Sequence, residues 1–157
     1  MKKDLAFMNE AVAQSLKGML AGEGGPFGAV VVKDGQIVGR GNNRVTSSND
    51  PTAHAEVEAI RDACRNLNTF QLDGCVLYTS CEPCPMCLGA IYWARPDKVY
   101  YANTREDAAD IGFDDNMIYE ELNVPMSGRR IPFAQIGREF AMDVFRQWTE
   151  KTNKIQY

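Results

Sequence analysis

Residues 79–87 read TSCEPCPMC and join a β-rich run to the start of a helix. The preceding run, residues 75–79, is typical of a buried strand because it is apolar and rich in β-forming residues. Pro85 suits the first turn of a helix, where its missing amide proton is not needed, so we expect a helix from about Cys84 to Ala94 that Pro96 stops. This junction predicts one strand–helix unit of an α/β fold.

The residues before this junction predict two helices and a hairpin. Apolar residues recur at three- and four-residue steps between Asp4 and Leu20, which predicts an amphipathic helix. Residues 27–33 and 36–41 are β-rich runs separated by Asp34-Gly35, the pair that a type I′ hairpin turn prefers. Pro51-Thr52 then opens a helical pattern that continues through Arg65.

The residues after the junction predict two further strands and a final helix. Residues 98–102 and 131–136 are expected to form the fourth and fifth strands, with a less regular region from 104 to 128 between them. A helix from Arg138 to about Lys151 closes the chain. The whole pattern predicts an α/β fold of three layers, α/β/α, with a central mixed five-stranded sheet.

Length and composition indicate one globular domain spanning residues 1–157. Hydrophobic residues make up 45% of the chain and charged residues 24%, which excludes a disordered chain. The formal net charge of −4 opposes nonspecific binding of nucleic acid. No run is long and apolar enough for a secretory signal or a membrane span, so we expect a cytoplasmic protein without membrane contact.

The cysteines indicate metal binding rather than disulfide bonds. The chain has five, an odd number, and three of them, Cys81, Cys84 and Cys87, fall within seven positions. The chain's one histidine lies in His54-Ala55-Glu56. His54, Cys84 and Cys87 together offer three ligands for Zn²⁺, because two cysteines three apart on a helix point the same way.

Three protein ligands are typical of a catalytic zinc, which keeps its fourth position for water. Residues two apart on a helix do not share a face, so His54 must lie at or before the helix start if Glu56 is to lie beside the metal. A carboxylate in that place can take a proton from the water and deliver it to a substrate. Glu56 is the candidate proton shuttle.

Two other interpretations of the cysteines remain open. Cys81 could be a fourth ligand and make a closed structural site of three cysteines and one histidine. Cys84 and Cys87 could instead form a redox pair. The other two, Cys64 and Cys75, are expected to be core thiols.

Several motifs carry a resemblance to a known family. His54-Ala55-Glu56 followed by residues 83–87, PCPMC, matches the zinc-deaminase pattern H-x-E…P-C-x-x-C. With GPFGAV at 25–30, YWARP at 92–96 and GFDD at 112–115, the chain closely resembles the bacterial guanine deaminases of the cytidine-deaminase-like superfamily. The resemblance spans nearly the whole chain and implies hydrolytic deamination of guanine to xanthine and ammonia by a zinc-activated water.

The resemblance also implies roles for residues around the metal. Asn43 and Asp115 become contacts to the edge of the purine, Asp115 also helping to move a proton, and Phe27 and Trp93 become walls of the base pocket. Main-chain amides near Ala55 are candidates for holding a ring carbonyl. Without the resemblance, Asn43 and Asp115 would be capping residues and the two aromatic rings would be core.

The resemblance gives the polar C-terminal segment a function. Residues 152–157 would ordinarily be expected to fray. In this family the segment is exchanged between two subunits of a homodimer, and its terminal tyrosine, here Tyr157, closes the partner's site. We therefore expect one Zn²⁺ per subunit, a small purine base as ligand and a second copy of the chain as partner.

Other functions share the same signature. A tRNA adenosine deaminase would need a basic surface, and Arg129-Arg130 is the only adjacent arginine pair in the chain. Cytosine, adenine or a pterin-like ring are alternative substrates. A non-catalytic zinc module that binds a partner is the alternative outside enzymes.

Overall fold

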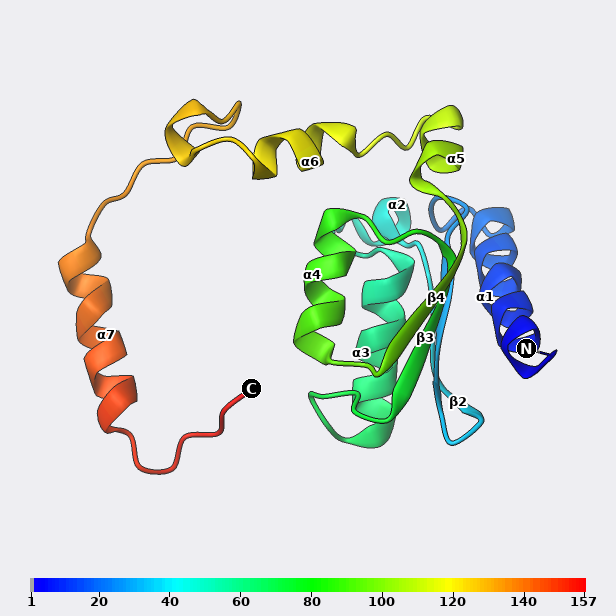
Figure 1. The fold of residues 1–157 in the computed structure, drawn as a ribbon, viewed down its shortest axis with the longest axis horizontal. Coiled ribbons are helices and arrows are strands. Elements are labelled where there is room, and N and C mark those ends of the chain that lie inside the picture. The colour runs from blue at the N-terminus through cyan, green and yellow to red at the C-terminus, as the bar shows by residue number, and fades with distance from the viewer. Residues whose placement is uncertain (1) are drawn as a thin grey trace. The chain divides into compact units, whose positions relative to one another are not determined.

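The computed structural model describes residues 2–157, which divide into two compact units, residues 2–115 and residues 116–157. The first unit is built on a sheet with the strand order β2-β1-β3-β4 (Figure 1). Every residue that the sequence placed at the metal lies in this unit.

The sheet of the first unit is mixed. Strands β1 (Gly28–Lys33) and β2 (Gln36–Asn42) form an antiparallel hairpin, and β3 (Cys75–Cys81) pairs antiparallel with β1. Strand β4 (Lys98–Asn103) runs parallel to β3. Asp34 and Gly35 have φ of 50° and 76°, so the hairpin turn has the two positive φ values of type I′, which confirms that prediction.

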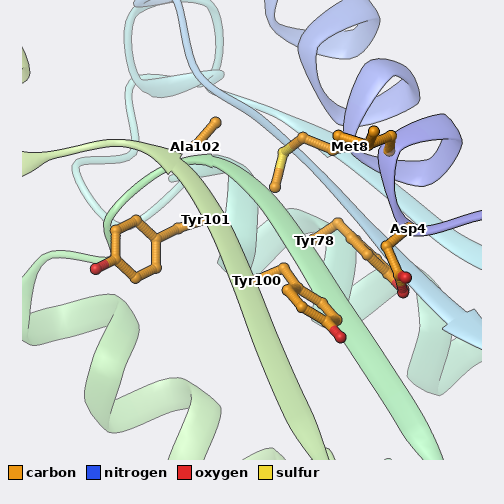
Figure 2. Close-up of a pocket in the computed structure, with 7 residues that line it drawn as sticks. Asp4, Met8, Tyr78, Tyr100, Tyr101 and Ala102 are labelled. Atoms are coloured by element: carbon orange, nitrogen blue, oxygen red, sulfur yellow. The ribbon is translucent and has the colours of Figure 1, made fainter. Parts of the chain in front are cut away.

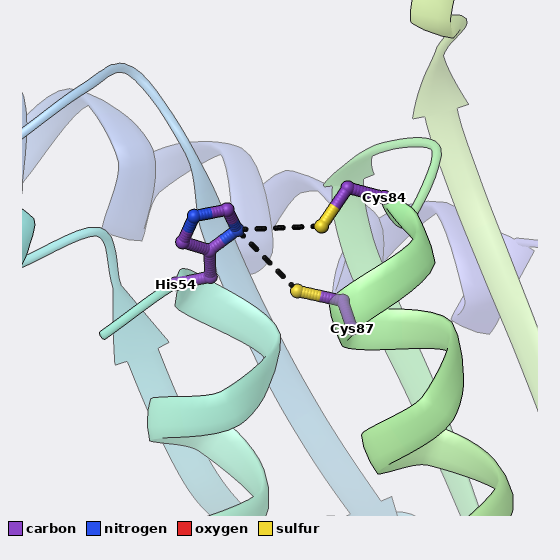
Figure 3. A group of neighbouring side chains, drawn as sticks. All are labelled: His54, Cys84 and Cys87. Carbon is purple, nitrogen blue, oxygen red and sulfur yellow. Dashed lines mark hydrogen bonds between the residues drawn. The ribbon is translucent and has the colours of Figure 1, made fainter. Parts of the chain in front are cut away.

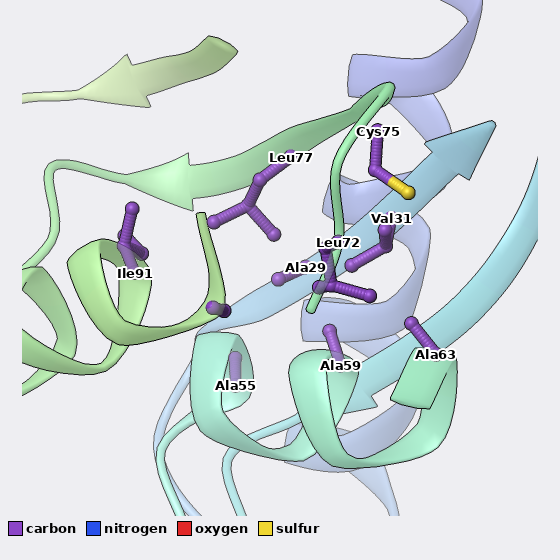
Figure 4. Packing of buried hydrophobic residues seen from close by; sticks show 10 residues of the cluster. Ala29, Val31, Ala55, Ala59, Ala63, Leu72, Cys75, Leu77 and Ile91 are labelled. Carbon is purple, nitrogen blue, oxygen red and sulfur yellow. The ribbon is translucent and has the colours of Figure 1, made fainter. Parts of the chain in front are cut away.

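Helices cover both faces of this sheet, which confirms the expected layers. On one face, α1 (Lys2–Leu20) packs on Val30 and Val32. On the other face, α3 (Ala55–Leu67) and α4 (Pro85–Ala94) pack on the cluster around Val31 and Leu77 (Figure 4). Neighbouring strand residues therefore serve opposite cores, as the period-two alternation of a strand requires.

A glycine in β2 lets the first turn of α3 lie directly on the sheet. A Cβ on Gly41 would stand 2.3 Å from the carbonyl oxygen of Ala55 and 2.4 Å from the amide nitrogen of Ala59. Any side chain at this position would push the helix away from the strand. The absence of a side chain at Gly41 thus determines how close Glu56, in the first turn of α3, lies to the sheet.

Two short helices in this unit were not predicted individually. A single turn, α2 (Val45–Ser48), precedes α3, which begins at Ala55 rather than at Pro51-Thr52. After β4, α5 (Arg105–Asp110) begins with a capping box in which Thr104 and Asp107 satisfy each other's main-chain amides.

The second unit contains three helical segments: α6 (Asn116–Leu122), the 3₁₀ turn η1 (Met126–Gly128) and α7 (Arg138–Glu150). The predicted final helix is therefore confirmed. Large apolar side chains along α7 are exposed, among them Phe140 at 74% and Phe145 at 66%.

The predicted fifth strand at residues 131–136 is wrong, and the sheet has four strands. Among the described residues this segment is neither strand nor helix. Three features of the structure oppose a strand here: the second unit has no strand to pair with, Pro132 lacks an amide donor, and Ile131 and Ile136 are exposed.

No helix within residues 2–157 is both long and apolar enough to cross a membrane.

Candidate metal centre

The side chains of His54, Cys84 and Cys87 converge at the ends of two neighbouring helices (Figure 3). Nδ1 of His54 lies 3.6 Å from Sγ of Cys84 and 3.5 Å from Sγ of Cys87. All three donor atoms lie within 4.8 Å of one another.

This donor set fits Zn²⁺ in both chemistry and size. Two thiolates and one imidazole are a ligand combination found in catalytic zinc sites. Zinc bonds of about 2.3 Å to sulfur and about 2.1 Å to nitrogen, at tetrahedral angles, separate the nitrogen from each sulfur by about 3.6 Å. The distances from the nitrogen to the two sulfur atoms are thus already those of two edges of a zinc tetrahedron.

Helix starts place the three donors. His54 is the N-cap of α3, with an extended backbone, and Cys84 is the N-cap of α4. Cys87 follows within the first turn of α4 and is fully buried. The expected place of His54 just before its helix is confirmed, and it leaves Glu56 in the helix's first turn.

Cys81 does not join the cluster. Its thiol donates to the carbonyl oxygen of Thr104 at 3.4 Å, and burial raises its pKa to about 11. Among residues 2–157, the metal-binding group around His54 has three members, so the four-ligand structural site has no support. Cys75 is part of the buried core, as expected.

The cluster favours negative charge on the sulfur of Cys84. A hydrogen bond with Cys87, followed by one with His54, lowers the pKa of Cys84. The hydrogen bond with Cys84, and then burial, raise the pKa of Cys87. The hydrogen bond between His54 and Cys84 raises the pKa of His54. A bound divalent cation would displace these protons.

Glu56 is buried beside the sulfur atoms. Its Oε1 accepts a hydrogen bond from the Thr79 hydroxyl at 3.2 Å, and its Oε2 accepts one from the Cys87 thiol at 3.4 Å. Burial raises the pKa of Glu56. A carboxyl group that holds a proton at higher pH than usual is suited to accept and return one near neutral pH.

Thr79 was missed by the sequence reasoning, although a signal for it exists. It lies two residues after Leu77 on β3 and pairs with Ala29 in the sheet register. Period-two alternation therefore puts its hydroxyl on the face that α3 covers. A buried hydroxyl on that face needs an acceptor, and Glu56 is the acceptor it has.

Asn43 and Phe27 lie side by side where β1 begins and β2 ends. The amide nitrogen of Asn43 donates to the carbonyl oxygen of Phe27 at 3.0 Å. The Phe27 ring meets Phe113 edge to face, with centroids 4.9 Å apart. Phe113, to which the sequence reasoning gave no role, thereby holds the segment that ends in Asp115 against Phe27.

The other predicted site residues differ in exposure. Asp115 is half-buried; burial, and then the negative charge of Cys84, raise its pKa, so it lies within electrostatic range of the cluster. Ala55 is buried as the first residue of α3. Trp93, on α4, is 65% exposed, and Tyr157, in the second unit, is 70% exposed.

A separate hollow of about 560 Å³ lies between α1 and the sheet (Figure 2). It is lined mainly by Met8, Tyr78, Tyr100 and Tyr101 and contains none of the predicted site residues. Its position on the α1 side separates it from the metal cluster, which lies at the starts of α3 and α4.

Comparisons with known proteins agree with this geometry. Residues 1–103 match the cytidine and deoxycytidylate deaminase zinc-binding region. The guanine deaminase of Bacillus subtilis is 57% identical over 151 residues, covering 96% of this chain and 97% of that protein. Its crystal structure superposes with a TM-score of 0.94 at 56% identity, covering 97% of both chains.

Two further relatives are more distant. A solved guanine deaminase structure from Nitrosomonas europaea is 30% identical, with a TM-score of 0.67, over 93% of this chain and 84% of that one. The tRNA-specific adenosine deaminase of Aquifex aeolicus is 33% identical over 145 residues, 92% of this chain and 93% of that protein.

Proposed function

Since the chain belongs to the cytidine and deoxycytidylate deaminase zinc-binding family, we propose that it is a zinc aminohydrolase that converts guanine and water to xanthine and ammonia. The observation that carries this proposal is the buried Glu56 carboxylate beside the His54, Cys84 and Cys87 donors. The 57% identity to a guanine deaminase favours guanine as the base that is deaminated.

One Zn²⁺ per chain would be held by His54, Cys84 and Cys87. Bound there, it supplies Lewis acidity that lowers the pKa of a water to about 7. Glu56 accepts the proton that the water gives up and delivers it toward N3 of the ring, beside the reacting C2. Because the Thr79 hydroxyl donates a hydrogen bond to Oε1 of Glu56, the carboxylate keeps its orientation during this transfer.

The purine would be recognised by groups around this centre. Asn43 and Asp115 would bind its polar edge, and Asp115 would help to protonate the 2-amino group so that it leaves as ammonia. Phe27 and Trp93 would flank its flat face, and the amide of Ala55 at the start of α3 would hold a ring oxygen. The position of Asn43 beside Phe27, and the contribution of the Cys84 charge to the raised pKa of Asp115, support this arrangement.

The functional unit would be a homodimer. The apolar side chains exposed along α7 need a covering surface, and a second copy of the chain provides one. In this arrangement residues 152–157 pass to the other subunit, and Tyr157 closes its site.

The second candidate is a tRNA adenosine deaminase, because the relative from Aquifex aeolicus carries that activity at 33% identity. The net charge of −4 disfavours a large RNA substrate.

Ammonia release from guanine, adenine, cytosine, their nucleosides and an anticodon-stem RNA decides among these functions. We expect release from guanine, and its loss in Glu56→Gln by about 10²-fold or more with zinc content unchanged. Release from the RNA alone would establish the second candidate. Absence of release from every compound, with Glu56→Gln indistinguishable from wild type, would instead indicate a binding module.

A further inference from the structure

The side-chain amide of Asn43 is held in one orientation. Its Oδ1 accepts hydrogen bonds from two main-chain amides, those of Gly25 and Val45, each at 3.2 Å. The side chain is almost completely buried. No hydrogen bond within residues 2–157 engages its Nδ2, so the NH₂ group is the part of this amide left for a ligand.

The turn that supplies the Gly25 amide is itself anchored on both sides. The carboxylate of Glu23 accepts a hydrogen bond of 2.7 Å from the side chain of Asn42. The main-chain carbonyl of Glu23 accepts from Thr46 and Ser47 of α2, each at 3.1 Å. Glu23 therefore fixes the turn between the end of β2 and the α2 helix.

Gly24 allows the turn to lie directly against Asn43. A Cβ at this position would stand 2.2 Å from Oδ1 of Asn43 and 2.6 Å from its main-chain oxygen. The main-chain oxygen cannot move without displacing the end of β2. Any larger residue at Gly24 would therefore push the Asn43 amide out of its orientation.

We propose that the Glu23–Gly25 turn is a specificity device that fixes Asn43 as a hydrogen-bond donor, so that the site selects a purine with a carbonyl oxygen at C6 over one with an amine there. This inference rests on the proposed function. Guanine has three ring-edge acceptors, and N3 lies beside the reacting C2, where Glu56 acts. N7 is an acceptor in both kinds of purine, whereas the acceptor O6 is replaced by an amino donor in a 6-aminopurine. A fixed donor on the protein therefore distinguishes the two purines most strongly at C6.

The test compares kcat/KM for guanine and for 2,6-diaminopurine, which has the same 2-amino group but an amine at C6. Asn43→Asp keeps the shape of the side chain and an oxygen for the Gly25 and Val45 amides, but it turns the donor into an acceptor. We expect guanine turnover to fall about 100-fold and the preference to reverse toward 2,6-diaminopurine.

Gly24→Ala tests the turn itself, with Gly89→Ala as the matched control. Gly24→Ala should reduce the guanine preference about 10-fold, mainly through KM, with zinc content unchanged. A Cβ on the exposed Gly89 meets nothing within 4 Å, so Gly89→Ala should keep the wild-type ratio.

Asn43→Asp tests the role of Asn43 as a donor even if Gly24→Ala fails to fold. An active wild type whose Asn43→Asp variant still prefers guanine would overturn the fixed-donor inference alone. A folded Gly24→Ala with the wild-type ratio would overturn the role of the turn. A wild-type protein that does not deaminate guanine would instead overturn the proposed function.

Discussion

The hydroxyl of Thr79 donates a hydrogen bond of 3.2 Å to Oε1 of Glu56, and both side chains are buried. Thr79 lies on β3 and Glu56 on α3, so this bond joins the sheet to the helix whose N-cap is His54. The Cys87 thiol, from α4, donates to the other oxygen of the same carboxylate. Because Cys87 would bind a metal as a thiolate, the Thr79 hydroxyl is the donor that remains to orient the proposed proton shuttle.

Replacing Thr79 tests this orientation. Thr79→Val has nearly the same volume but removes the donor, so the Glu56 carboxylate loses the hydrogen bond that orients it. We expect kcat on guanine to fall about 10-fold with a smaller change in KM, because misplacing a reacting group slows the chemical step. Thr79→Ser keeps the hydroxyl and should retain most of the activity. Equal losses in the two variants would show that Thr79 acts through packing alone.

The three-ligand assignment predicts that two neighbouring cysteines respond differently to substitution. Cys84→Ser should lose most of the bound zinc and all measurable turnover, since a serine hydroxyl is not deprotonated as a thiol is. Cys81→Ser should retain zinc, because that thiol faces the carbonyl of Thr104. Metal analysis of the purified variants measures both. A Cys81→Ser protein without zinc would reinstate the four-ligand site.

Stability at alkaline pH should depend on Tyr78. Burial, and then the hydrogen bond that its hydroxyl donates to Asp4, raise the pKa of Tyr78 from 10 to about 12. The folded state thus binds this proton more tightly than the unfolded state does. The resulting stabilisation is fully present below pH 10 and is lost as the pH rises from about 10 to about 12.

Urea unfolding at pH 8 and pH 11 measures this effect. Between the two pH values, the free energy of unfolding of the wild type should fall more than that of Tyr78→Phe, which has no proton to lose. Identical pH dependence in the two proteins would exclude Tyr78 as the titrating group.

Local sequence patterns predicted most of the first unit because each of its elements carries its own signal. The Asp34-Gly35 turn, the proline at position 85 and the apolar periodicities fix these elements without distant contacts. The segment at 131–136 shows where this reasoning stops. Its β-forming residues Ile131, Phe133 and Ile136 favour a strand locally, but a strand also needs a neighbouring strand to bond with, and a local pattern contains no information about one.

The metal cluster could be predicted for a similar reason. His54 and the two cysteines lie at helix starts, and proline residues and spacing mark those starts in the sequence. The partners that orient the site were not predicted, because Thr79, Gly24 and Phe113 act through contacts between residues far apart in the chain. Only the folded structure shows which buried hydroxyl meets which carboxylate.

Removal of residues 155–157 tests the proposed lid. If Tyr157 closes the site, the truncated protein should lose most of its guanine turnover while keeping its zinc and its oligomeric state, since the apolar side chains of α7 remain. Kinetics, metal analysis and light scattering measure these three properties. Undiminished turnover would exclude the lid.

Mixing two inactive variants distinguishes a lid in the same chain from one in the partner. Glu56→Gln has an intact C-terminal segment but no proton shuttle, whereas the truncated chain has Glu56 but no Tyr157. If the segment acts on the partner, a dimer with one chain of each kind contains one complete site, in which Tyr157 of the Glu56→Gln chain closes the site of the truncated chain. Co-expression should then restore about half of the wild-type activity per mixed dimer. If Tyr157 acts within its own chain, neither site is complete and no activity returns.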